Sequence, residues 1–460
     1  MIRVVALLVL TMTSGCYSSP DDLDPIGFHL AIHDCPPVVA SANAKCGFVR
    51  VPEDYSNRAG RTIDLNVIVF NALERGNQHS AQFDLEGGPG FAVTDSAAFY
   101  AVDGAMYRTH RDLVLADMRG TGGSAGLFCQ NITEHEKVNP GFPFYPPELV
   151  RDCADALSTR ADLRQYTTAA AARDIDAIRE ALGYQQLDLN ALSYGTALAL
   201  RYIADFPARV RTAVLTGTAP AGRMPPRYHA MAAERGLGLL FQACAADATC
   251  SANYPNPASD LDRATARLDV EARAVFLEKI RTMLYLPNSA RRVPLALRKA
   301  ADGDFQMFDG RPGGRRFADG LYLSITCSES LAMMDLDKAI AESDATRFGA
   351  YRLRRQREAC RQWPTAKPDP KLTELADSDV PVLFISGALD PVTPPEWAAE
   401  SAIQFPASRH VIVAQGGHVL EGMSGMDTCL DRVVPQFVSI GSATGIDMAC
   451  FDSMKAGAFQ

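Results

Sequence analysis

A serine stands where one stretch of the chain changes its pattern. In LDLNALSYGTALAL, residues 187–200, apolar and polar residues alternate up to Ser193, and the segment beyond it continues with a helical pattern. A strand that turns sharply into a helix exposes a serine hydroxyl at the turn, and one class of hydrolase holds its nucleophile there. The segment therefore predicts a nucleophilic serine, although Ala191 stands where the pattern usually has glycine.

The partners that such a serine needs follow later in the chain. A serine hydroxyl is a weak nucleophile and requires an adjacent base that is itself oriented by a carboxylate. Asp390 lies in ISGALDPVTPP and His418 lies in AQGGHVLEG, each directly after an expected strand. Because serine, acid and histidine follow in the order of the strand–turn–helix hydrolases, we predict Ser193 as nucleophile, Asp390 as orienting acid and His418 as base.

The tetrahedral intermediate of such a reaction also requires backbone N–H donors. One donor would be the amide of Tyr194, the residue after the nucleophile. The second would come from a glycine-rich loop after an early strand, and LEGGPGFA, residues 85–92, is such a loop. Since Pro89 has no N–H, we expect Gly88 to donate. The alternatives in this loop are Gly87 and Gly90.

Competing candidates for the acid and the base have poorer settings. Asp117, in DMRG after an expected strand, precedes the serine, and its neighbour Arg119 offers an ion-pair partner, so we interpret both as structural. The other histidines lie early in the chain, outside a glycine-rich turn, on an expected helix or before a strand: His29, His33, His79, His110, His135, His229 and His410.

The surrounding elements alternate between strand and helix. Apolar runs predict strands at 62–70, 80–85, 112–116, 187–191, 210–217, 380–386 and 410–414, and helices at 167–183 and from 194 to about 206. Strand-like runs nearly vanish between 220 and 375. This order predicts an α/β fold, with a mostly parallel sheet flanked by helices and a helical cap inserted before the last two strands. The expected divisions are a signal peptide (1–16), an N-terminal extension (17–45), a first segment of the hydrolase core (46–219), the helical cap (220–375) and a second segment of the hydrolase core (376–460).

Composition excludes several other classes of protein. The formal net charge is −9 and no basic stripe is present, so we expect no nucleic-acid partner. No dinucleotide-binding glycine pattern follows a strand, and no Cys/His cluster has zinc spacing. We therefore expect neither a cofactor nor a metal.

The N-terminus has the form of a secretory signal. A basic start and the apolar run 4–12 are followed by small residues and Cys16, which resembles a lipoprotein signal whose cysteine is lipidated. The alternative is plain cleavage and release of a secreted protein. Of 11 cysteines, 10 remain when Cys16 is set aside, an even number that suits disulfides in an oxidising compartment. Pairing of sequence neighbours is one economical scheme: Cys35–Cys46, Cys129–Cys153, Cys244–Cys250, Cys327–Cys360 and Cys429–Cys450.

Together, GGPG (87–90), DMRGTGGS (117–124), SYGT (193–196), GALDPVTPP and GGHV resemble the S33 peptidase family of α/β-hydrolases, which includes proline iminopeptidases and tripeptidyl aminopeptidases. The C-terminal segment resembles the domain typical of the tripeptidyl aminopeptidases. The resemblance implies the same roles for Ser193, Asp390, His418, Tyr194 and the GGPG loop. The sequence departs from the family pattern at Ala191, and at Glu86, where many iminopeptidases have histidine.

An aminopeptidase must also recognise a free α-ammonium, which calls for a carboxylate near the site. Glu329, in TCSES, is the first candidate and Glu86 the second. The expected activity is serine exopeptidase, with an esterase on small acyl esters as the alternative, since the same residues serve both reactions. An inactive hydrolase fold that binds a partner is the third hypothesis. Dehalogenase and epoxide chemistry is disfavoured because those relatives have aspartate at the position of Ser193.

Overall fold

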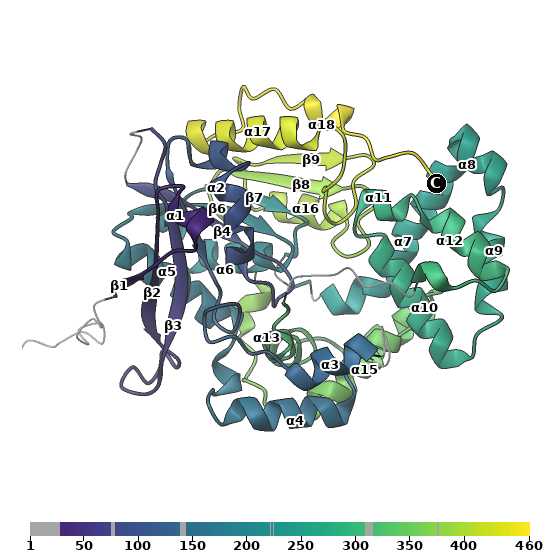
Figure 1. The fold of residues 1–460 in the computed structure, drawn as a ribbon, viewed down its shortest axis with the longest axis horizontal. Helices are drawn as coiled ribbons and strands as arrows, with labels where there is room; N and C mark the ends of the chain where they lie inside the picture. Colours follow the sequence, from purple (N-terminus) through teal and green to yellow (C-terminus); the bar gives the residue numbers. More distant parts are fainter. Residues whose placement is uncertain are drawn as a thin grey trace, which may run out of the picture.

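Nine strands form one sheet in the region of the chain that the structure describes (Figure 1). The structure is a computed structural model and describes residues 28–74, 79–138, 144–220, 222–223, 225–308, 316–374 and 377–460. The expected signal peptide and Cys16 lie outside the described residues. The strands are β1 (Leu30–His33), β2 (Ala44–Pro52), β3 (Thr62–Phe70), β4 (Ser80–Leu85), β5 (Asp112–Ala116), β6 (Gln186–Leu192), β7 (Val210–Thr216), β8 (Val382–Gly387) and β9 (Arg409–Val413).

The order of the strands is β1-β2-β3-β5-β4-β6-β7-β8-β9. The first three pairs, β1 with β2, β2 with β3 and β3 with β5, are antiparallel, and every later pair is parallel. The carboxyl ends of the parallel strands therefore meet at one edge of the sheet, where α/β proteins place their sites. The predicted α/β-hydrolase fold is confirmed, and β1 and β2 add to the strands expected from sequence.

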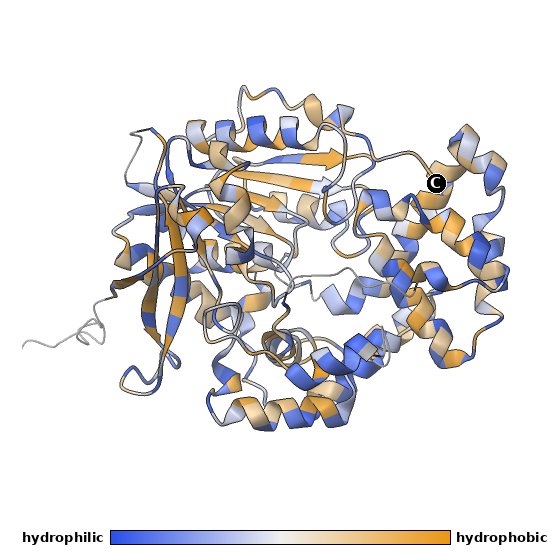
Figure 2. Cartoon of the chain, in the orientation of Figure 1, coloured by the Kyte–Doolittle hydropathy of each residue, from blue (hydrophilic) through white to orange (hydrophobic). Residues whose placement is uncertain are grey.

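Helices cover both faces of the sheet. One face packs against three helices, and their apolar residues join the largest core cluster: α5 (Thr168–Ala181), α6 (Tyr194–Asp205) and α16 (Pro395–Ala402). The other face packs against α1 (Pro37–Ala40), α2 (Ala97–Ala101), α17 (Met426–Ile440) and α18 (Cys450–Ser453). The central strands are correspondingly hydrophobic, while the exposed side of α17 is polar (Figure 2).

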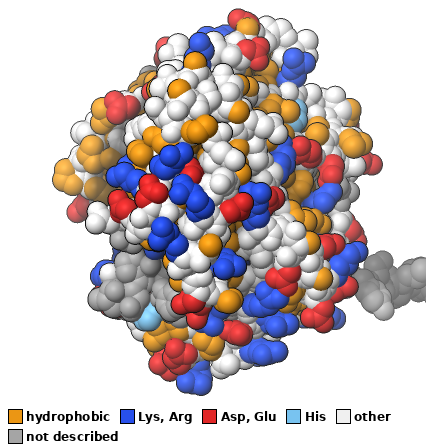
Figure 3. Space-filling model, turned by 90° about the vertical axis from the view of Figure 1, so that its right-hand side faces the viewer, with side chains coloured by type: hydrophobic (Ala, Val, Ile, Leu, Met, Phe, Trp, Pro, Cys, Tyr) orange, Lys and Arg blue, Asp and Glu red, His pale blue; other side chains and the backbone are white. Residues whose placement is uncertain are grey.

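The cap consists of the helices between β7 and β8. Its members are α7 (Pro225–Ala246), α8 (Ala248–Asn253), α9 (Pro257–Thr265), α10 (Val270–Met283), α11 (Pro287–Ala290), α12 (Val293–Ala301), α13 (Asp319–Ile325), the π-helical turn η6 (Thr326–Ser330), α14 (Leu336–Asp344) and α15 (Tyr351–Cys360). The described residues of this insertion contain no strand. Figure 3 looks onto the cap end of the molecule, where acidic and basic side chains are interspersed.

Two helices from outside this insertion also contribute to the cap. α3 (Gln130–Val138) and α4 (Pro147–Ser158) follow β5, yet they share a hydrophobic cluster with α13, η6 and α15 (Figure 1). The helices α7 to α12 form a second cluster, in which Phe459 of the C-terminal tail is also buried. The domain limits expected from sequence stay a prediction, and packing adds α3 and α4 to the cap side.

Disulfide bonds join neighbouring segments within both core and cap. The five bonds of the structure are the five predicted pairs: Cys35–Cys46, Cys129–Cys153, Cys244–Cys250, Cys327–Cys360 and Cys429–Cys450. Within the described ranges, no helix is both long and apolar enough to span a membrane.

Candidate active site

Ser193 occupies a strained turn between β6 and α6. Its backbone angles are φ 56° and ψ −122°, a positive φ that residues other than glycine rarely adopt. Strand β6 ends at Leu192 and α6 begins at Tyr194, so the chain changes direction around this one residue. Gly195 permits the close approach of the helix, because a Cβ there would lie 2.2 Å from the carbonyl oxygen of Leu85.

Ala191, the departure from the usual pattern, is accommodated without difficulty. Its side chain is 3% exposed and belongs to the main hydrophobic core. The first small residue of the turn therefore tolerates a methyl group, whereas Gly195 has no room for one.

The structure brings together the three residues predicted as nucleophile, base and acid. The hydroxyl oxygen of Ser193 lies 2.8 Å from Nε2 of His418, and Nδ1 of His418 lies 2.8 Å from Oδ2 of Asp390. Ser193 follows β6, Asp390 follows β8 and His418 follows β9, so parallel strands of one sheet position all three. With its proton on Nδ1, the imidazole donates to the carboxylate and leaves Nε2 to accept the serine proton.

The turn after β8 fixes the carboxylate of Asp390, which is fully buried. The backbone amides of Val392 and Thr393 donate to Oδ1 at 2.7 and 2.8 Å, and the Thr393 hydroxyl donates to Oδ2 at 2.8 Å. The same hydroxyl lies 3.1 Å from Nδ1 of His418. The carboxylate of Asp390 thus accepts several hydrogen bonds from its own loop, and these set its orientation toward His418.

The GGPG loop lies against the nucleophile. A Cβ on Gly87 would approach the Cβ of Ser193 to 2.9 Å, so only glycine fits there. The amide of Gly87 donates to Oε1 of Glu86 at 3.0 Å. Because that amide has a partner, Gly88 is the better placed of the two to donate to a reaction intermediate. The amide of Tyr194 is at the first turn of α6, where helix N–H groups lack intrahelical partners.

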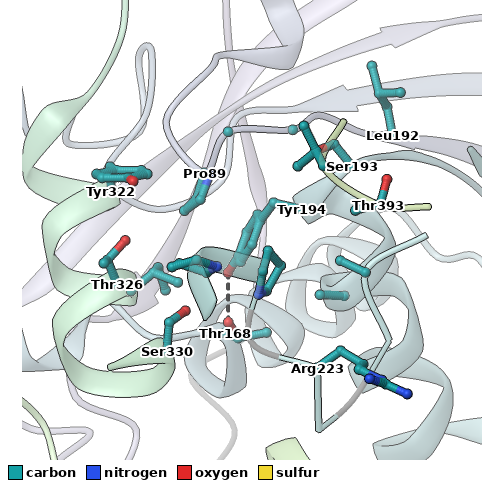
Figure 4. A pocket seen from close by; sticks show the side chains of 18 of the residues that line it. Pro89, Thr168, Leu192, Ser193, Tyr194, Arg223, Tyr322, Thr326, Ser330 and Thr393 are labelled. Atoms are coloured by element: carbon teal, nitrogen blue, oxygen red, sulfur yellow. Dashed lines mark hydrogen bonds between the residues drawn. The ribbon is translucent and has the colours of Figure 1, made fainter. Parts of the chain in front are cut away.

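A cavity of about 650 Å³ opens in front of Ser193. Figure 4 shows the turn with Ser193 and Tyr194 on one side and the cap residues Tyr322, Thr326 and Ser330 on the other. Such a volume lies within the range of sites that hold small ligands. Ser193 therefore faces a cavity between the core and the cap.

Comparison with known proteins finds two matching families. Residues 85–248 match the family described as "alpha/beta hydrolase fold", and residues 344–450 match the family described as "TAP-like protein". These ranges contain the turn with Ser193 and the loops with Asp390 and His418. The chain has the α/β-hydrolase fold. Its C-terminal segment is TAP-like, as the resemblance of the sequence predicts.

Relatives of this hydrolase include enzymes named as peptidases. The "Serine protease Hip1" of Mycobacterium tuberculosis is 26% identical, with 89% of this chain and 87% of the relative covered. The "Tripeptidyl aminopeptidase" of Streptomyces lividans is 25% identical, with 88% and 83% covered. A solved structure of a thermophilic esterase from Thermogutta terrifontis has a TM-score of 0.41 and 15% identity, with 86% of this chain and 99% of that chain covered. The named relatives support a serine hydrolase of the peptidase kind.

Glu329 of the hydrolase lies in the cavity wall and contacts the start of α5. Its carboxylate accepts hydrogen bonds from the Thr168 amide at 2.7 Å and from the Thr168 hydroxyl at 2.5 Å. The Thr168 hydroxyl lies 2.7 Å from the phenol oxygen of Tyr194, as the dashed line in Figure 4 marks. Burial raises the pKa of Glu329 to about 7, and the hydrogen bonds from Thr168 oppose this shift. Glu329 is thus connected to the residue that follows the nucleophile.

Glu86, the second candidate, is partly buried and also lines the cavity. It directly precedes the GGPG loop and accepts the hydrogen bond from the Gly87 amide. Both predicted carboxylates therefore border the space in front of Ser193, one from the core and one from the cap.

One detail of the sequence interpretation is corrected by the structure. Arg119 does not pair with Asp117, because its guanidinium donates to both oxygens of Asp174 at 2.6 and 2.7 Å. Asp117 instead accepts hydrogen bonds from Asn66, Thr94 and Gly123, so both residues remain structural.

Two further side chains, those of Trp397 and His410, have structural positions. Trp397 is buried on α16 against Tyr228 of α7, with ring centroids 5.4 Å apart, and it does not line the cavity. His410 lies within β9, where Nε2 is 2.9 Å from the Ser386 hydroxyl, which is a structural role.

Sequence reasoning missed several residues that surround the reacting groups. These are Thr168, His229, Arg281, Tyr285, Arg352 and Thr393. Thr393 stands within the quoted stretch GALDPVTPP, and its position three residues after Asp390 is a signal that could have identified it. The others reach the cavity from helices far away in sequence, and no local pattern marks them.

Proposed function

We propose that this hydrolase is a serine exopeptidase that removes residues from the free N-terminus of peptides, as an aminopeptidase of the prolyl or tripeptidyl type. The observation that carries the proposal is the hydrogen-bonded series Ser193–His418–Asp390 beside a cavity between the core and the cap. The named peptidase relatives and the TAP-like match support the same conclusion.

In the proposed mechanism, the Ser193 oxygen attacks the carbonyl carbon of the scissile bond while Nε2 of His418 accepts the hydroxyl proton. Asp390 stabilises the imidazolium that forms. The amides of Tyr194 and Gly88 donate to the oxyanion of the tetrahedral intermediate. His418 then protonates the leaving amine, and the acyl-enzyme on Ser193 is hydrolysed by a water that His418 deprotonates.

Recognition of the free N-terminus is assigned to the two carboxylates of the cavity. Glu329 lines the cavity from the cap and Glu86 lines it from the core, and the carboxylate of either can accept hydrogen bonds from an α-ammonium. The contact of Glu329 with Thr168 leaves further acceptor positions on its two oxygens, since a carboxylate offers about four.

The test compares substrates that differ at the N-terminus. Purified wild type and Ser193→Ala are assayed with free-amine aminoacyl and tripeptidyl anilides, the same anilides after N-acetylation, and a p-nitrophenyl ester. We expect turnover of free-amine anilides that N-acetylation and Ser193→Ala both abolish. The size of the preferred acyl group then distinguishes the prolyl type from the tripeptidyl type. Ester turnover alone would make the protein an esterase, and no Ser193-dependent turnover would favour the binding-protein hypothesis.

We also propose that Cys16 carries the lipid that attaches the protein to the cell envelope. The form of the N-terminal segment supports this, and the five disulfides are compatible with an extracytoplasmic location. Labelling of the expressed protein with a fatty-acid analogue tests it. We expect the wild-type protein to be labelled and the variant Cys16→Ser to lack the label. Unlabelled wild-type protein free in the medium would indicate secretion instead.

A further inference from the structure

Two arginines of the cap share one carboxylate at the cavity wall. Arg281 of α10 donates through Nε to Oε2 of Glu278 at 3.1 Å. Arg352 of α15 donates to the same oxygen through Nε at 2.9 Å and Nη2 at 2.7 Å. Both arginines line the cavity. Burial disfavours the charge on Glu278, but the two guanidiniums outweigh it and lower its pKa to about 2, so the acid is ionised.

The cluster therefore carries an excess positive charge. Among the described residues, the salt bridges of Arg281 and Arg352 are to Glu278 alone, which leaves two cations for one anion. The other arginines of the cavity wall differ, since Arg201 bridges to both Asp205 and Asp369, and Arg223 bridges to Glu400.

His229 of α7 lies in the same region of the cavity wall and adds no further charge. Burial and the nearby guanidiniums of Arg281 and Arg352 hold its pKa well below its usual value, so it is neutral. The excess charge of the cluster thus comes from the two arginines, which can offer planar pairs of N–H donors to an anion.

Tyr285 lies between the arginine cluster and His418 and contacts both. Nη1 of Arg281 donates to the phenol oxygen of Tyr285 at 2.8 Å. The ring of Tyr285 packs edge to face on the imidazole of His418, with centroids 5.2 Å apart. The imidazole is the group that protonates the leaving amine in a serine peptidase. The positive cluster therefore lies on the side of His418.

We infer that Arg281 and Arg352 bind a carboxylate of the peptide fragment that leaves when the acyl-enzyme forms. This inference rests on the proposed function and names its substrate class: short peptides whose leaving fragment carries a negative charge near the cut. The charge comes either from the α-carboxylate of a short leaving fragment or from an acidic side chain next to the scissile bond. Both sources present the same planar group to the guanidiniums.

The test uses peptides in pairs that differ only in the leaving fragment. The acyl group preferred among the anilides is joined to one of four leaving residues. The first pair compares alanine as the free acid with alanine amide. The second pair compares aspartic acid amide with asparagine amide. A hydrogen bond to a charged group changes binding by roughly tenfold or more, so we expect wild type to favour the charged member of at least one pair by about tenfold in kcat/KM. The first pair reports the α-carboxylate and the second reports the side chain.

Variants then assign the preference to the cluster. Arg352→Gln is expected to bring the charged-to-neutral ratio close to one, and Arg352→Lys to retain some of it. The matched control is Arg227→Gln, which removes a cap arginine that pairs with Glu342 and does not line the cavity, and its ratio should equal that of wild type. Calorimetric binding of the same peptides to Ser193→Ala gives the ratio independently of turnover and of the variants' folding.

The negative results of these experiments contradict either the proposed function or the carboxylate site. No turnover of any free-amine substrate contradicts the proposed function, while the calorimetric ratio still tests the cluster. The carboxylate site is overturned if wild type is active but its charged-to-neutral ratio is near one in both pairs. It is also overturned if Arg352→Gln and Arg352→Lys leave that ratio unchanged.

Discussion

At the scale of single residues, Thr393 connects the acid of the site to its base. Its hydroxyl donates to Asp390 and lies within hydrogen-bond distance of His418. Removal of this hydroxyl by Thr393→Val is expected to lower kcat by roughly tenfold or more, because hydrogen bonds to charged groups contribute about 1.5–3 kcal/mol. Thr393→Ser keeps the hydroxyl and should retain most of the rate. Steady-state kinetics that show equal losses for Val and Ser would contradict this role.

The proposed contact of Glu329 with the α-ammonium of the substrate would make recognition of the N-terminus depend on pH. Its pKa is raised to about 7, so the carboxylate is largely neutral below that pH and charged above it. An α-ammonium keeps its charge up to about pH 8. We therefore expect kcat/KM for free-amine substrates to rise between about pH 6 and 8, beyond any rise seen with the ester.

The matching variant isolates this contribution. Glu329→Gln cannot ionise, so its free-amine profile should follow the ester profile, with KM raised by roughly tenfold for loss of one charged contact. Parallel pH profiles for the two substrates in wild type would show that Glu329 does not bind the ammonium.

The residues of the site differ in how far sequence could predict them. Ser193, Asp390 and His418 follow strands in short patterns that local chemistry requires, and the structure brings them together as predicted. The contact of Glu329 with Thr168 spans 161 positions, and it exists only because the cap folds back over α5. No local pattern encodes such a contact, and the same is true of Arg352 with Glu278.

At the scale of elements, the strand-to-helix turn depends on two small residues in unequal ways. Gly195→Ala would place a Cβ 2.2 Å from the Leu85 carbonyl oxygen, so β4 or α6 would have to move. We expect a loss of activity of at least about tenfold and a lower melting temperature, because overpacking typically costs about 1–3 kcal/mol. Ala191→Gly is the matched control and should keep the activity, with at most about 1 kcal/mol lost. Thermal unfolding and anilide kinetics measure the effect of each variant. Equal losses for Gly195→Ala and Ala191→Gly would contradict the turn geometry.

The elements themselves follow from sequence where their apolar pattern is continuous. The strands β3 to β8 are largely buried, while β9 at the edge of the sheet is partly exposed, and the apolar runs of all of them predict their positions closely. Strand β1 is short and largely exposed, and β2 interrupts its apolar residues with Lys45, Gly47 and Arg50, so neither has the continuous pattern of a buried strand. The pairing of β1 with β2 and of β2 with β3 is set by the fold and not by local composition.

At the scale of the whole molecule, disulfides join segments of the core and of the cap. Cys327–Cys360 closes a loop with a sequence separation of 33, and Cys244–Cys250 one of only 6. Loop closure predicts that the longer bond stabilises by about 1.5 kcal/mol more. The double substitution Cys327→Ala/Cys360→Ala should therefore lower the melting temperature more than Cys244→Ala/Cys250→Ala. Differential scanning calorimetry without reductant measures this, and the reverse order would contradict it.

The core and the cap together make the enzyme, because the core supplies Ser193, His418 and Asp390 while the cap encloses the space in front of them. The central claim is that Ser193 is the nucleophile of this enclosed site. A fluorophosphonate probe reacts with an activated serine, and mass spectrometry of the digested protein locates the adduct. The account predicts one adduct, on the peptide that contains Ser193, that is absent from Ser193→Ala and strongly reduced in His418→Ala. An adduct on another residue, or peptide hydrolysis that persists in Ser193→Ala, would contradict it.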